Sequence, residues 1–248
     1  MSPLISERIS VVGLTGGIAT GKSTVSTLFK SRQIPVIDAD VLAREVVQPG
    51  AKGLTQIVAY FGSEVLFPDG TLDRKKLGAI IFNNEVKRKK LNSIIHPAVS
   101  RAILWNVFLC WLRGEKLCVV DVPLLIEGGL WKWMGKVVVV YCSADIQLQR
   151  LMTRDNSSRE DASARLNSQL PIAQKVEYAD IVLDNSGTVQ DLEQQVRLCL
   201  VKLERIAGWS WRLSWLFPPF ALVSMLWTLG WRSVKRSRRQ SRGPFKGI

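Results

Sequence analysis

Eight consecutive residues near the start of the chain have the spacing of a phosphate-binding loop. They are Gly16, Gly17, Ile18, Ala19, Thr20, Gly21, Lys22 and Ser23. They match G-x-x-x-x-G-K-[ST] at every fixed position, after an apolar run and before a helical pattern at residues 22–30. The glycines let main-chain N–H groups point at a polyphosphate, and the start of the helix adds to the attraction. The pattern predicts a bound nucleoside triphosphate, with Lys22 at its β- and γ-phosphates and Ser23 on Mg²⁺.

Aspartates directly follow two other apolar runs. Asp38 and Asp40 come after residues 34–37, and Asp121 comes after residues 117–120. A carboxylate at the first position could accept the proton of an attacking hydroxyl group, or it could cap a helix that begins near residue 39. The residues alone do not choose between Asp38 and Asp40 for these two roles. Asp121 follows an apolar strand-type run. An acidic residue at this place in a phosphate-loop protein usually holds Mg²⁺, often through water.

Four arginines lie in or just before a polar stretch at residues 154–178, which we interpret as a lid over the phosphates. They are Arg150, Arg154, Arg159 and Arg165. Guanidinium groups stabilise the charge that phosphoryl transfer spreads over the equatorial oxygens. A solvated helix face is the alternative for each of them, and Arg154 is the first candidate for the chemistry.

His96 is the only histidine of the chain and is followed by Pro97. We expect a helix to start at this pair, because proline suits the first turn of a helix. One histidine cannot form a multi-histidine metal site. A helix cap or a hydrogen bond to substrate is the expected role.

Five apolar, β-type runs alternate with helical patterns and must position these residues. The runs are residues 9–14, 34–37, 117–120, 137–141 and 181–183. This alternation predicts an α/β fold with a parallel sheet covered on both faces. Ligands in such folds bind beyond the carboxyl ends of the strands, which is where the loop and the aspartates fall. The stretch at residues 41–113 shows helical periodicity without a convincing strand, so we expect a helical insertion there.

Charge and cysteine content limit the classes of function. The formal net charge is +13, and seven basic residues and no acidic residue follow Trp231. A dedicated nucleic-acid binder would carry its basic stripe on the folded part, so we expect a small anionic substrate and no nucleic-acid partner. The four cysteines show no C-x-x-C spacing and lie in apolar runs, which predicts buried, reduced thiols.

Residues 215–231 form an uncharged run of 17 residues with tryptophans at both ends. The length is at the low edge for a membrane-spanning helix, and the tryptophans suit a membrane interface. Pro218 and Pro219 argue against an unbroken helix. A short membrane anchor is the favoured interpretation; an interfacial segment or a helix packed on the domain are the alternatives.

Taken together, eight segments resemble the dephospho-CoA kinase family, in the right order over about residues 9–205. They read VGLTGGIATGKSTV (12–25), VIDADVLAREVVQPG (36–50), FG (61–62), DGTLDR (69–74), IHP (95–97), DVPLLIE (121–127), RD (154–155) and ADIVLDNSG (179–187). The resemblance implies a phosphate-loop fold, with a five-stranded parallel sheet flanked by helices, a helical substrate-binding insertion and a lid. It implies ATP-dependent phosphorylation of the ribose 3′-hydroxyl of dephospho-CoA, the last step of coenzyme A synthesis, with Mg²⁺.

The resemblance also implies a role for each matching residue. Asp40 would take the proton of the hydroxyl, and Arg154 would close over the phosphates beside Lys22. Arg44 and His96 would hold the acceptor, together with Asp121.

On the donor side, the eight loop residues and Thr24 would cradle the ATP phosphates, and Asn185 and Gly187 would border the adenine. Ala19 and Thr20 depart from the Gly-Ser that the family usually shows.

The expected organisation is a kinase domain at residues 9–207, an apolar segment at 208–231 and a basic tail at 232–248. The anchor would tether a cytosol-facing enzyme to a peroxisome, a mitochondrion or the endoplasmic reticulum; without it, a soluble cytoplasmic enzyme is expected. A related kinase of another small hydroxyl or nucleotide acceptor, and a tethered nucleotide-binding adaptor without catalysis, are the alternative functions. The sequence does not indicate the oligomeric state.

Overall fold

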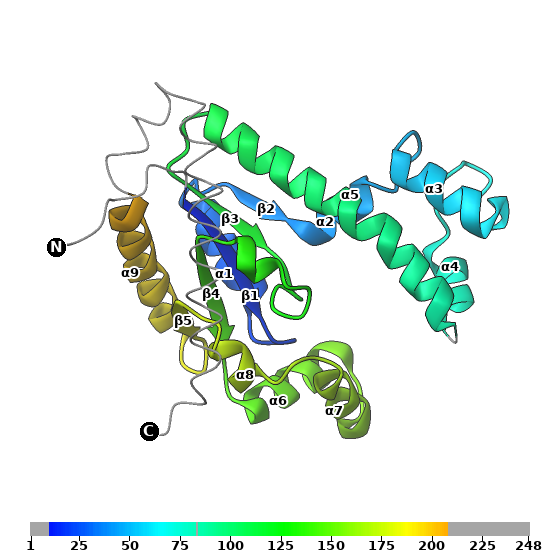
Figure 1. Ribbon diagram of the computed structural model, residues 1–248. Coiled ribbons are helices and arrows are strands. Elements are labelled where there is room, and N and C mark those ends of the chain that lie inside the picture. Colours follow the sequence, from blue (N-terminus) through cyan, green and yellow to red (C-terminus); the bar gives the residue numbers. More distant parts are fainter. Residues whose placement is uncertain (1–9, 83, 208–248) are drawn as a thin grey trace, which may run out of the picture. The chain divides into compact units, whose positions relative to one another are not determined.

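The computed structural model describes residues 10–82 and 84–207 (Figure 1). These residues divide into two compact units. The first unit comprises the described residues up to Val36 and from Gly114 onwards, and the second is Ile37–Arg113. The predicted apolar segment at 208–231 and the basic tail lie outside the described residues.

The sheet has five strands in the order β2-β3-β1-β4-β5. They are β1 (Ser10–Gly16), β2 (Val36–Asp38), β3 (Leu117–Asp121), β4 (Lys136–Tyr141) and β5 (Ile181–Asp184). Strand β1 pairs in parallel with β3 and β4, and β4 pairs in parallel with β5. The five predicted strands and the α/β fold class are confirmed, with ends that differ by one or two residues.

The core of the first unit lies between the sheet and two helices, α1 (Lys22–Ser31) and α9 (Val189–Ala207). Phe29 of α1 and Leu192, Val196 and Leu203 of α9 are buried against the strands. Each such side chain contributes about 1.5–3 kcal/mol on burial. This packing fixes the start of α1, which carries Lys22, against the end of β1.

All four cysteines are buried, as predicted. Burial raises the pKa of the Cys199 thiol to about 11 and also raises the pKa of Cys142. Because a buried thiol resists losing its proton, the thiolate form of Cys199 at pH 8 amounts to about 10⁻³ of the total. We expect the native chain to resist a thiol-specific reagent at pH 8 and to expose four reactive thiols in denaturant. Rapid labelling of the native chain would contradict this.

After the end of β2, the described residues of the second unit are helical apart from one isolated antiparallel bridge between Leu66 and Leu72. Its helices are α2 (Ala39–Glu45), α3 (Lys52–Phe61), α4 (Arg74–Phe82) and α5 (Glu85–Leu112), with a short 3-10 turn, η1 (Ser63–Val65). Helices α2, α3 and α4 pack against the long α5 (Figure 1). Its own core includes Ile57, Phe61, Val65, Leu77, Leu91 and Ile94. The helical periodicity of residues 41–113 therefore corresponds to a separately packed unit.

The expectation that a helix starts at His96 and Pro97 is wrong, because both residues lie inside α5. The helix begins after Asn84, whose side chain accepts a hydrogen bond from the N–H of Lys87 at 2.9 Å. Pro97 removes one helical hydrogen bond. Buried residues on both sides of it, Leu91 and Ile103 among them, hold the helix to the unit.

By length and composition alone, α5 is the one helix of the described part of the chain that could cross a membrane. Helices α2, α3 and α4 pack against it, as they would against the central helix of a folded unit.

Candidate active site

The phosphate-type loop lies between β1 and α1 and has two residues in the left-handed region. These are Ala19, with φ of 61°, and Gly21, with φ of 88°, which caps α1. Successive peptides of alternating hand make a concave main chain whose N–H groups can bind an anion. The family usually has glycine where this chain has Ala19. The left-handed conformation explains that preference, because it costs alanine about 1–2 kcal/mol.

Three alternate carbonyl groups of the loop accept hydrogen bonds from side chains outside it. Nζ of Lys175 donates to Gly16 at 3.3 Å. Nε2 of Gln147 donates to Ile18 at 2.8 Å, and Nδ2 of Asn185 donates to Thr20 at 2.8 Å. A trans peptide points its C=O and N–H in opposite directions. These bonds therefore turn the N–H groups of Gly17, Ala19 and Gly21 away from the three donor side chains.

The donors of these bonds come from the segment that follows β4. Gln147 is on α6 (Ala144–Asp155), and Lys175 is on α8 (Ile172–Val176). Asn185 directly follows β5, and Gln169, between α7 (Arg159–Asn167) and α8, accepts from the N–H of Ile18 at 3.2 Å. The helices α6, α7 and α8 gather at the lower end of the sheet in Figure 1. The loop shape is therefore fixed by side chains far away in the sequence.

Close packing of these donors explains the loop glycines. A Cβ at Gly17 would lie 2.4 Å from Nε2 of Gln147, and one at Gly21 would lie 2.1 Å from Nδ2 of Asn185. No side chain fits at either position unless its neighbour moves. The loop thus needs glycine for space as well as for conformation.

We expect Gly21→Ala to destabilise the chain by more than the strain of a positive φ, about 1–3 kcal/mol. It should also weaken ATP binding, because the Asn185 amide must leave Thr20. Gly129→Ala is the matched control: its φ is 71°, it belongs to the same unit, and nothing lies within 4 Å of its Cβ. Urea unfolding and ATP titration of both variants check this; equal losses in both would contradict it.

Lys22 forms an ion pair with Asp121, with Nζ and Oδ1 2.5 Å apart. The Asp121 side chain is almost fully buried, and that of Lys22 is 20% exposed. A buried carboxylate needs such compensation. The pair places the loop lysine next to the acidic residue predicted at the end of β3.

Oxygen donors that suit Mg²⁺ are present at this edge of the first unit. Ser23 is exposed at the start of α1, and Asp121 ends β3. Among residues 10–82 and 84–207, no three His, Cys, Asp or Glu side chains are grouped to hold a metal ion. Mg²⁺ usually takes one or two protein oxygens and completes its shell with phosphates and water.

The candidate arginine, Arg154, lies in the last turn of α6 and makes a two-point ion pair with Asp155, at 2.7 and 3.1 Å. Arg165 of α7 also binds Asp155, at 2.7 Å. The hydrogen bond from Arg154, ahead of the other contacts, lowers the pKa of the Asp155 carboxyl. One carboxylate thus joins α6 to α7 and holds two of the four predicted arginines.

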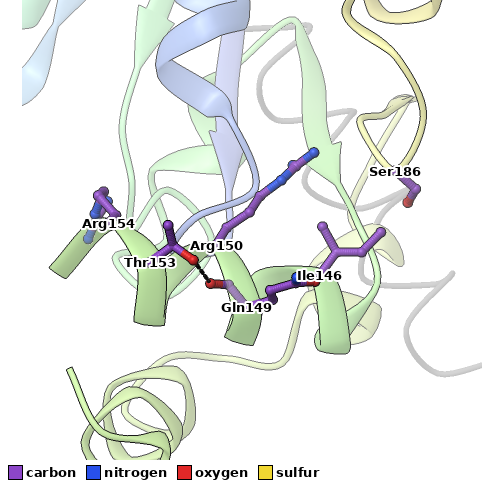
Figure 2. Close-up of a pocket in the computed structure, with 6 residues that line it drawn as sticks. All are labelled: Ile146, Gln149, Arg150, Thr153, Arg154 and Ser186. Carbon is purple, nitrogen blue, oxygen red and sulfur yellow. Dashed lines mark hydrogen bonds between the residues drawn. The ribbon is translucent and has the colours of Figure 1, made fainter. Parts of the chain in front are cut away.

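A shallow cavity of about 540 Å³, wide open to solvent, lies along α6. It is lined by Ile146, Gln149, Arg150, Thr153, Arg154 and Ser186. Figure 2 shows the first five on α6 and Ser186 on the turn after β5, with the guanidinium groups of Arg150 and Arg154 pointing to different sides. This turn contains Asn185, which is buried, and Gly187, which is exposed. Two of the predicted arginines therefore line the cavity, whereas Asn185 and Gly187, expected at the adenine, flank its lining residue Ser186.

The remaining predicted site residues lie in the second unit. Asp38 caps α2: its Oδ1 accepts from the N–H groups of Asp40 and Val41, at 2.9 and 3.2 Å. Asp40 is exposed in the first turn of α2, and Arg44 is exposed one turn later. His96 is exposed on α5. The capping role left open between the two aspartates belongs to Asp38.

Sequence reasoning missed three side chains that hold the loop: Gln147, Gln169 and Lys175. Lys175 stands out, because the prediction placed it in a polar lid but its side chain is fully buried. A polar side chain at an inward position of α6 was the only signal for Gln147. Nothing local marks a contact across more than a hundred residues.

The chain is similar in sequence to a known family of proteins. A family model described as dephospho-CoA kinase matches residues 10–191. A dephospho-CoA kinase of Arabidopsis thaliana is 48% identical over 204 residues, which cover 82% of this chain and 88% of the relative. One of Geobacillus kaustophilus is 51% identical over 185 residues, covering 75% and 92% of the two chains.

Solved structures agree with the sequence relatives. The structure of dephospho-CoA kinase from Campylobacter jejuni has a TM-score of 0.63 at 32% identity and covers 79% of this chain and 97% of that one. A protein from Thermus thermophilus has a TM-score of 0.64 at 31% identity, with coverage of 78% and 97%.

Proposed function

The chain belongs to the dephospho-CoA kinase family and catalyses the last step of coenzyme A biosynthesis, and we propose that the loop at residues 16–24 holds its donor, ATP, while Asp40 receives the proton of the acceptor. The acceptor is the 3′-hydroxyl of the ribose of dephospho-CoA. The observation that carries the division of roles is the loop itself: its carbonyls at Gly16, Ile18 and Thr20 are bound from outside, so the N–H groups of the same peptides point the other way, toward the proposed triphosphate.

On the donor side, Lys22 exchanges Asp121 for the transferred phosphoryl group when ATP binds. Its partial exposure leaves the ammonium room to turn toward the nucleotide. Ser23 and Asp121 would hold Mg²⁺, which when bound neutralises charge on the phosphate oxygens. Charge that develops on the equatorial oxygens is stabilised by the loop N–H groups, by Lys22 and by Arg154.

On the acceptor side, Asp40 is the general base. Since Oδ1 of Asp38 holds the cap of α2, we assign the 3′-hydroxyl proton to the Asp40 carboxylate. Arg44, on the next turn of the same helix, suits a phosphate oxygen of the acceptor, and His96 offers a further hydrogen bond. The helical unit at residues 41–113 is then the coenzyme-binding part of the enzyme.

The adenine of ATP suits the cavity between α6 and the turn after β5. Ser186, which lies between Asn185 and Gly187, lines it on one side and Arg150 on the other, and a guanidinium plane can stack on a base. Residues 154–178 would act as a lid, with Arg154 leaving Asp155 for the phosphates as the lid closes.

The test is a panel of acceptors incubated with the full chain, ATP and Mg²⁺. ATP should be consumed when dephospho-CoA is present at micromolar concentration, and dephospho-CoA should gain one phosphate at its 3′ position. ATP should not be consumed with shikimate, gluconate or nucleoside monophosphates as acceptors. Turnover of another acceptor and not of dephospho-CoA would favour a related kinase. ATP binding without any turnover would favour a nucleotide-binding adaptor.

Membrane contact through residues 208–231 is proposed from their apolar composition and their tryptophans. The full chain and residues 1–207 are expressed and sedimented with lipid vesicles. The full chain should sediment and the shorter chain should not. Equal recovery of both in the soluble fraction without detergent would contradict the anchor.

A further inference from the structure

The side chain of Lys175 is fully buried, yet it carries a charge. Its Nζ lies 2.8 Å from Oε1 of Glu127, and it donates to the carbonyl oxygens of Gly16 at 3.3 Å and Pro123 at 3.4 Å. An ammonium group has three N–H donors, so each donor has an acceptor. Burying a charge is costly unless it is paired and hydrogen-bonded, and here both conditions are met.

Two of these acceptors belong to different parts of the active site. Gly16 begins the phosphate loop, and Pro123 lies two residues after Asp121, the partner of Lys22. The ends of β1 and β3 are also joined by the N–H of Val122 bonded to Leu14 and by Oγ1 of Thr15 bonded to Pro123, at 3.0 and 2.9 Å. Lys175 adds a charged contact that spans the two loops.

The bond to Gly16 also acts on the N–H of Gly17, since the two groups share one peptide. A cationic donor on a carbonyl makes the N–H of the same peptide a stronger donor, because hydrogen bonds polarise one another. The neutral amides of Gln147 and Asn185 act on the corresponding peptides further along the loop. Among these three donors to the loop carbonyls, Lys175 alone is charged.

We propose that Lys175 is a positioning residue for phosphoryl transfer: its buried ammonium orients the first peptide of the phosphate loop and keeps that loop in register with the segment after Asp121. Glu127 is its counter-ion and also accepts from the N–H of Leu170 at 3.3 Å, which ties the segment just before α8 to the same point. This role rests on the phosphoryl transfer proposed above, and it involves no contact between Lys175 and substrate.

The test uses Lys175→Met, which keeps an unbranched side chain one atom shorter and removes its charge and donors. We expect kcat to fall about tenfold, below the effect of losing a donor that touches the transition state directly. The KM for dephospho-CoA should stay within about twofold, because the acceptor does not depend on the loop. Amide hydrogen exchange should rise in residues 10–25 and 117–130 and stay unchanged in α9.

Lys202→Met is the matched control, since Lys202 is exposed on α9 of the same unit. Glu127→Gln is the second variant: it keeps every heavy-atom position and the acceptor for Leu170 but leaves the ammonium without its counter-ion. Where Lys175→Met does not fold, Glu127→Gln decides, with an expected loss of about threefold in kcat and the same two segments exchanging faster.

A folded Lys175→Met chain with the kcat of the parent would overturn the proposal. So would a loss of activity that merely follows a lower folded fraction, with exchange rising uniformly. If the parent chain fails to phosphorylate dephospho-CoA, the proposed function fails. A change in exchange of the two segments and in ATP affinity would then still support the positioning of the loop by Lys175.

Discussion

Asp40→Asn should lower kcat by about 10²–10⁴-fold, the usual effect of a positioned general base, while ATP binding survives. The amide cannot accept the proton of the 3′-hydroxyl, but it keeps the size of the carboxylate. The hydrogen bonds that cap α2 are accepted by Oδ1 of Asp38 and not by the Asp40 side chain. Steady-state kinetics with dephospho-CoA and an ATP titration of the same variant separate catalysis from binding.

Asp38→Asn is the matched control for this result. It removes a carboxylate two residues away, but asparagine caps a helix about as well as aspartate. We expect its kcat to stay within about threefold of the parent. A normal rate for Asp40→Asn, or a larger loss for Asp38→Asn, would show that the base is misassigned.

Lys22→Met should reduce kcat/KM by at least about 10³-fold, and ATP affinity should fall with it. The lysine supplies charge both to the bound triphosphate and to the transition state, so that both binding and turnover depend on it. The substitution has a second effect, because it takes away the ammonium group that lies 2.5 Å from buried Asp121. Removing one partner of a buried pair typically destabilises by about 3–5 kcal/mol.

The double variant Lys22→Met/Asp121→Asn separates these two effects. Its stability should recover in part, because the asparagine at position 121 carries no charge that needs the Lys22 ammonium, and its activity should not. Thermal unfolding and kinetics of the three chains check this. Activity that recovers together with stability would mean that Lys22 acts through folding and not on the phosphates.

The sequence predicts the sheet well because each strand is a short, continuous apolar run. Strands β3 and β4 are buried over most of their length, and such runs are typical of parallel strands covered on both faces. The loop between β1 and α1 was equally visible, since its chemistry is concentrated in eight adjacent residues.

Two parts of the second unit illustrate the limits of local patterns. The choice between Asp38 and Asp40 needed the geometry of the helix start, where Oδ1 of Asp38 meets two main-chain N–H groups. The pair His96 and Pro97 looked like a helix start but lies inside α5, because packing on both sides of the proline outweighs one lost hydrogen bond.

The residues that brace the loop could not be predicted, for a different reason. Gln147 and Lys175 contact residues that are 129 and 159 positions away in the chain. Such contacts are set by the order of the strands in the sheet, not by periodicity. Lys175 was therefore assigned to a solvated lid, although it is buried beneath the loop.

Calorimetric titration of the full chain with ATP, in the presence and absence of Mg²⁺, tests the central claim most directly. The main-chain N–H groups of residues 16–24 and Lys22 should give saturable binding of one ATP per chain, in the micromolar range and tighter with Mg²⁺. Lys22→Met should weaken that binding. Absence of saturable, Mg²⁺-dependent heat from the parent chain would contradict the assignment of the loop as a triphosphate site.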